Sequence, residues 1–69
     1  MKISARNFLE GMVKAVHKGA TTAHVEIELK GGGTVTSSIT NEAVAELGLK
    51  PGTQAYAVIK ASDVMIAVK

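Results

Sequence analysis

The chain has 69 residues, no cysteine and a formal net charge of +2. This length admits one domain, residues 1–69, and the lack of cysteine excludes disulfides as a source of its stability. The small positive charge suits an anionic ligand but is too weak to indicate nucleic acid.

The N-terminal part of the chain predicts one long strand, residues 3–9 and 12–18, bent at Gly11, because isolated glycines in strands often mark bends. Residues two apart in an extended chain point to the same side. The opening stretch "ISARN" therefore carries the Ser4 hydroxyl and the Arg6 guanidinium side by side.

The next strand, residues 23–30, "AHVEIELK", alternates apolar with polar residues, which is typical of one buried and one solvated face. If residues 19–22 form the hairpin loop, His17 lies opposite His24 across the two strands. With Glu26 nearby, the two imidazoles are a candidate zinc site. The alternative is an ordinary pair of surface or interface histidines.

"GGG" at 31–33 predicts a turn, and the β-branched residues of 34–39 predict a third strand. The pattern then changes to a helical period. Thr40 is suited to cap a helix of about two turns, and Gly48 is suited to end it.

Residues 53–60 and 63–68 predict two further strands, joined by the tight link Ala61-Ser62. The order is three strands, a short helix and two strands. This is the order of an all-β fold, a small OB-like five-stranded barrel with one short helix between strands 3 and 4.

Three segments contain residues that are suited to binding an anionic ligand. Ser4 and Arg6 offer donors, the helix start at Thr40 offers positive potential, and the turn with Lys60 and Ser62 adds a charge, a hydroxyl and amide groups. No thiol, carboxylate pair or histidine triad suggests catalysis, so we expect no enzyme activity.

The hydrophobic fraction of 46% in so short a chain favours buried contacts between copies. The register of the two histidines also places Val13 and Ala15 on the polar face, as in a surface that another chain covers. Charged residues interrupt the first twenty positions, and no apolar run can span a membrane, so a cytoplasmic protein is expected. Phe8 and Tyr56 alone make a poor platform for stacking nucleic-acid bases.

Three segments that suit an anion together resemble the molybdate-binding Mop family, the molbindins. They are "ISARN" at 3–7, "ITNEAVAELGL" at 39–49 and "IKASDVMIAV" at 59–68. "VEIELKGGG" at 25–33 resembles the central hairpin of that family. The resemblance implies a cytoplasmic protein that binds molybdate or tungstate, without a cofactor, and that stores or buffers molybdate for molybdenum-cofactor supply. It also implies a homohexamer, a trimer of dimers, with oxyanions at the subunit interfaces and molybdenum or tungsten bound only as the oxyanion.

The resemblance also implies which residues hold the oxyanion. Ser4 and Arg6 would bind it from one subunit, and the partner would contribute Thr40, the backbone N–H of Ala43, and Lys60, Ala61 and Ser62. Many relatives have Ser at the position of Ala43, which predicts weaker binding here. A second class of site would use the loop Lys18, Gly19 and Ala20. An OB-type nucleic-acid-binding module and a pure oligomerisation domain remain the alternatives.

Overall fold

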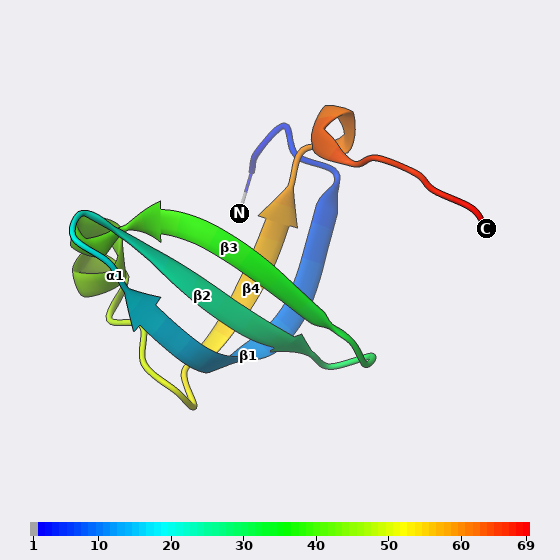
Figure 1. Ribbon diagram of the computed structural model, residues 1–69. Coiled ribbons are helices and arrows are strands. Elements are labelled where there is room, and N and C mark those ends of the chain that lie inside the picture. Colours follow the sequence, from blue (N-terminus) through cyan, green and yellow to red (C-terminus); the bar gives the residue numbers. More distant parts are fainter. Residues whose placement is uncertain (1) are drawn as a thin grey trace.

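The computed structural model describes residues 2–69 and contains four strands, one α-helix and one 3-10 turn. In chain order these are β1 (Asn7–Lys18), β2 (Thr22–Leu29), β3 (Thr34–Thr40), α1 (Asn41–Leu47), β4 (Gln54–Ile59) and η1 (Ala61–Asp63). The strands form one antiparallel sheet in the order β3-β2-β1-β4, which curls over the core with α1 at one end (Figure 1). Within the described part of the chain, no helix is long and apolar enough to cross a membrane.

The all-β class and the helix between the third and fourth strands are confirmed, but a fifth strand is not. Residues 63–68, expected as a strand, lie outside the sheet. The link at Ala61-Ser62 winds into a 3-10 turn, in which Asp63 N–H donates to the Lys60 oxygen at 2.9 Å. The turn directs the following residues away from the sheet (Figure 1). The sheet described here is therefore not a closed five-stranded barrel, and β3 and β4 are both edge strands.

The first strand begins at Asn7, not at Ile3. Its partner β4 ends at Ile59, the residue paired with Asn7, so residues 3–6 have no neighbouring strand with which to form a ladder. The predicted alternation is nevertheless present, since Ala5 is buried and both Ser4 and Arg6 are exposed.

β1 runs without interruption through Gly11, and its pairing with β2 is irregular at Lys14, between Val13 and Ala15. Such a bulge inserts one residue and changes the face on which earlier residues lie. Val13 consequently pairs with Ile27 and is only 2% exposed, so the expectation that it lies on the polar face is wrong. Ala15 pairs with Glu26 and remains on that face.

The core lies on the concave side of the sheet. It consists of small and β-branched side chains with Val44 of α1 packed against them: Val13, Ala23, Val25, Ile27, Val44 and Ala57. Between the edge strands β3 and β4 this core is open, and an apolar groove of about 500 Å³ remains there. The core of the isolated chain is therefore small and unclosed on one side.

Candidate functional site

The first group of predicted site residues lies at one end of the β1–β4 ladder. Asn7 pairs with Ile59, and its side-chain Nδ2 donates to the Ile59 carbonyl oxygen at 3.0 Å. Arg6 precedes this pair and Lys60 follows it, so the two cations leave the sheet from the same end. Both are exposed, and within residues 2–69 neither takes part in an ion pair or a side-chain hydrogen bond.

The turn η1 continues directly from Lys60. Its first amide groups, those of Ala61 and Ser62, are at the start of the turn, where N–H groups lack a partner within the helix. The Ser62 hydroxyl is exposed and adds a further donor. Asp63 ends the turn and places one negative charge beside these donors. This end of the molecule therefore offers two cations, hydroxyls and amides, with one carboxylate.

The second group lies at the start of α1. Thr40 is the N-cap, and its Oγ1 accepts a hydrogen bond from Ala43 N–H at 3.0 Å. The Ala43 amide thus has a partner within its own chain, whereas the hydrogen of the Thr40 hydroxyl is available to a ligand. Glu42 occupies the first turn of the helix and reduces its positive potential.

The loop that matches the second class of site lies next to this helix start. Lys18, Gly19 and Ala20 are exposed between β1 and β2. Asn41, the first residue of α1, donates from Nδ2 to the Gly19 oxygen at 3.0 Å. Its backbone N–H also donates to the Thr21 oxygen at 2.9 Å.

Asn41 was not predicted as a site residue, because its partner is 22 positions away in the chain and no local pattern indicates the contact. Its Oδ1 is buried without a hydrogen-bond partner among residues 2–69. Through Asn41, the helix start and the loop form one structural unit.

The two groups lie apart. Ser4, Arg6 and the Lys60–Ser62 turn are at the end of the sheet where the N- and C-terminal segments meet, and α1 is on another side of the molecule (Figure 1). One chain does not bring them together. A pocket that uses both groups requires two chains.

The predicted register of the two histidines is confirmed, since His17 pairs with His24 across β1 and β2. Both are exposed on the convex face. Across the described positions 2–69, no three side chains of the types that bind metals are grouped together. The two histidines therefore lie as an exposed pair across β1 and β2.

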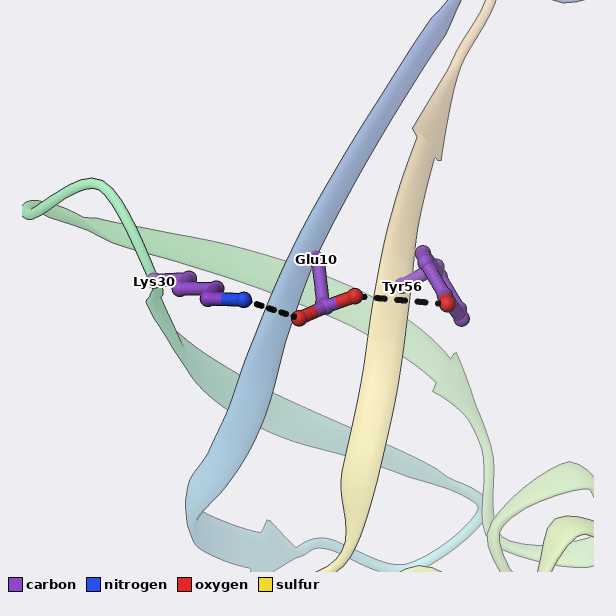
Figure 2. Close-up of polar contacts among 3 residues, drawn as sticks. All are labelled: Glu10, Lys30 and Tyr56. Carbon is purple, nitrogen blue, oxygen red and sulfur yellow. Dashed lines mark hydrogen bonds and ion pairs between the residues drawn. The ribbon is translucent and has the colours of Figure 1, made fainter.

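A cluster of polar contacts that the sequence did not indicate joins β1, β4 and the turn after β2 on the convex face. Glu10 of β1 lies between Lys30 and Tyr56 (Figure 2), with Oε2 at 3.3 Å from Lys30 Nζ and Oε1 accepting from the Tyr56 hydroxyl at 3.4 Å. The Lys30 side chain is 79% exposed, so water screens the pair. This cluster links strands and is separate from both donor groups.

The chain was compared with known proteins. Residues 3–66 match the TOBE domain. Molybdenum-pterin-binding protein 3 of Clostridium pasteurianum is 54% identical over 66 residues, which cover 96% of this chain and 97% of that protein. A solved molybdate-binding protein from Sporomusa ovata superposes with a TM-score of 0.91 at 38% identity, over 99% of this chain and all of that one.

The molybdate-bound structure of ModG, described as a cytoplasmic molybdate-binding protein, superposes with a TM-score of 0.90 at 57% identity. The match covers 94% of this chain and 46% of ModG. The match to the domain, the 54% identity over nearly the full length of one relative and the agreement in fold with two solved structures lead to one conclusion. The chain belongs to the TOBE-domain family and, within it, to the molybdate-binding Mop family.

Proposed function

We propose that this protein is a cytoplasmic molybdate-binding protein, and that it binds the oxyanion at interfaces between its own copies. The observation that carries the proposal is the 57% identity, over 94% of this chain, to a structure of ModG with molybdate bound. Relatives with molybdenum-pterin-binding names across their full length support the same ligand class.

The donor set suits this ligand. Molybdate is a tetrahedral dianion without a proton at neutral pH, so its four oxygens accept hydrogen bonds from several directions. Arg6 and Lys60 supply charge, and Ser4, Thr40 and Ser62 supply hydroxyls. The amides of Ala61 and Ser62 complete the proposed pocket, with a smaller part for Ala43, whose N–H already donates to Thr40.

A pocket made of these donors, with the Asp63 carboxylate outside it, discriminates among oxyanions. Monohydrogen phosphate carries a proton that needs an acceptor, and leaving a buried polar group unpaired costs about 1–3 kcal/mol, or roughly tenfold or more in affinity. Sulfate has no such proton, so only the size of the pocket can reject it. Tungstate has the same shape and charge as molybdate, and we propose that it also binds.

The separation of the donor groups supports a site shared between chains. We propose residues 1–69 as one Mop-type domain that assembles as a homohexamer, a trimer of dimers. The resemblance implies that Lys60–Ser62 comes from the partner, but this turn lies at the same end of one chain as Ser4 and Arg6. We therefore propose that Ser4, Arg6 and the Lys60–Ser62 turn of one copy face Thr40 of its partner. Lys18, Gly19 and Ala20 form the second class of site. The proposed role is storage or buffering of molybdate for molybdenum-cofactor supply, a binding role without catalysis.

Calorimetric titration with molybdate, sulfate and phosphate tests this function. Arg6→Ala is expected to weaken molybdate binding at least tenfold, because it removes a charged donor from the anion. Lys50→Ala is the matched control, since Lys50 is exposed in the loop after α1, and it is expected to bind as the original chain does.

A melting temperature that molybdate does not raise would contradict the proposal, because a ligand that prefers the folded state must stabilise it. That result would favour a pure oligomerisation domain. If a filter-binding assay at low salt retained an oligonucleotide with the protein, that result would instead favour a nucleic-acid-binding module.

A further inference from the structure

The only two histidines of the chain, His17 and His24, lie directly opposite each other across β1 and β2. Residues in this position have Cβ atoms about 4.5–5.5 Å apart, so the two imidazole rings can reach a common point between them. Both side chains are exposed, and within residues 2–69 neither takes part in an ion pair or a side-chain hydrogen bond. Their ring nitrogens are therefore available to a ligand from solvent.

The surroundings of this pair are polar and open on one side. On β3, the exposed Ser38 pairs with His24. β1 pairs with β4 only as far as Met12, so in the described part of the chain no strand lies beside His17 on its outer side. Glu26 follows His24 by two positions and therefore shares its face, where its carboxylate adds negative charge. An ion bound to both rings would thus have free space on the outer side of β1.

We infer that His17 and His24 of one chain together bind one divalent transition-metal ion of the kind that prefers imidazole, with Cu²⁺ bound most tightly. Imidazole is a ligand for Cu²⁺, Ni²⁺ and Zn²⁺, and Cu²⁺ has the highest affinity of this series for a given nitrogen site. Among residues 2–69 no third metal-binding side chain is grouped with the pair, so water fills the other coordination positions. A structural zinc site has four protein ligands, and the pair is therefore an exchangeable site of a different type.

The ion would join β1 to β2 at the base of the loop that Asn41 holds. This loop lies between the two histidines, and its Gly19 and Thr21 oxygens accept hydrogen bonds from Asn41 at 3.0 and 2.9 Å. In the unfolded chain nothing keeps the two rings opposite each other. The ion consequently prefers the folded chain and stabilises it. This inference does not rest on the proposed oxyanion, which would bind through other residues.

Calorimetric titration with Cu²⁺ tests the site, and one ion per chain is the expected stoichiometry. His17→Gln and His24→Gln are each expected to weaken binding about tenfold or more, because a single ring loses the second ligand that the fold holds beside it. Mg²⁺ is the control ion and is not expected to bind, since it prefers oxygen ligands. One ion per two chains would mean that the ion bridges copies, and unchanged affinity in either variant would mean that the rings act separately. Either result overturns the inference.

A double variant, His17→Gln with Lys18→His, is the matched control for geometry. It keeps two histidines in the chain but moves one to the next position of β1, where an extended strand points its side chain to the opposite face. It also removes a positive charge, which by itself would favour a cation. We expect this variant to bind Cu²⁺ as weakly as His17→Gln, and Cu²⁺ to raise its melting temperature less than that of the original chain. Electron paramagnetic resonance should show two bound nitrogens in the original chain and one in the variant. Equal affinity of the double variant and the original chain would refute the paired site.

Discussion

Asn7 donates its side-chain amide to the carbonyl oxygen of Ile59, 52 positions further along the chain, at 3.0 Å. The bond closes the last pair of the β1–β4 ladder, immediately before Arg6 and Lys60 leave the sheet. Residues 3–6 have no ladder of their own, so this side-chain bond adds to the backbone pairing of Asn7 with Ile59 and to the burial of Ala5 in placing the N-terminal donors beside the turn after β4. Asn7 is thus a positioning residue for the proposed oxyanion site.

Replacing Asn7 by Ala should therefore affect binding more than stability. Loss of one partly buried hydrogen bond is expected to cost about 1 kcal/mol of unfolding free energy. Molybdate affinity is expected to fall beyond what the stability loss explains, because Arg6 loses its fixed position. Thr53→Ala is the control, since it removes a comparable bond, in which Lys50 N–H donates to Thr53 Oγ1 at 3.2 Å, far from Arg6. Equal molybdate affinity in the two variants, by calorimetry, would show that Asn7 has no positioning role.

Thr40 has a structural and a proposed ligand-binding role, which two substitutions separate. Thr40→Ala removes the cap from α1 and is expected to destabilise the fold by about 1 kcal/mol in urea titrations. Thr40→Ser keeps both the acceptor for Ala43 N–H and the hydroxyl donor, so it should retain stability and molybdate binding. If Thr40→Ala bound molybdate as tightly as Thr40→Ser, the hydroxyl would not be a ligand.

Gly11 allows β1 and β2 to approach closely. A Cβ added there would lie 2.4 Å from the Glu28 carbonyl oxygen and 2.8 Å from Cγ2 of Ile27. Because one of these neighbours is backbone, Gly11→Ala must displace β2 and is expected to cost about 1–3 kcal/mol. Gly31→Ala, where an added Cβ meets nothing within 4 Å, should stay within about 0.5 kcal/mol. Chemical denaturation of both variants measures the difference, and similar midpoints would exclude this packing role.

The Glu10 cluster should contribute little in comparison. Its partner Lys30 is 79% exposed, and exposed ion pairs are typically worth less than about 1 kcal/mol. Glu10→Gln is therefore expected to change the unfolding free energy by a few tenths of a kcal/mol, and less at high salt. A loss as large as that of Gly11→Ala in the same denaturation assay would mean that the cluster holds the strands together.

Several features of this protein follow from local patterns in the sequence. The alternation in residues 23–30 predicts β2, and Thr40 and Gly48 predict the two ends of α1. The short loop after β1 predicts that His17 faces His24. Each of these depends on neighbours in the chain, and a period or a cap is visible in one sequence. The similarity of three segments to the Mop family predicted the family that the comparisons confirm.

Contacts between distant residues determined the rest. The bulge at Lys14 moves Val13 into the core, and the end of β4 at Ile59 fixes where β1 begins. The apolar pattern of residues 63–68 predicts a fifth strand, but a strand exists only beside another strand, and the turn η1 directs the last residues away from their own sheet. The amino-acid sequence shows which residues can donate hydrogen bonds to an anion. Only the fold decides that Arg6 and Thr40 lie apart in one chain, because strand pairing, not spacing in the sequence, sets their separation.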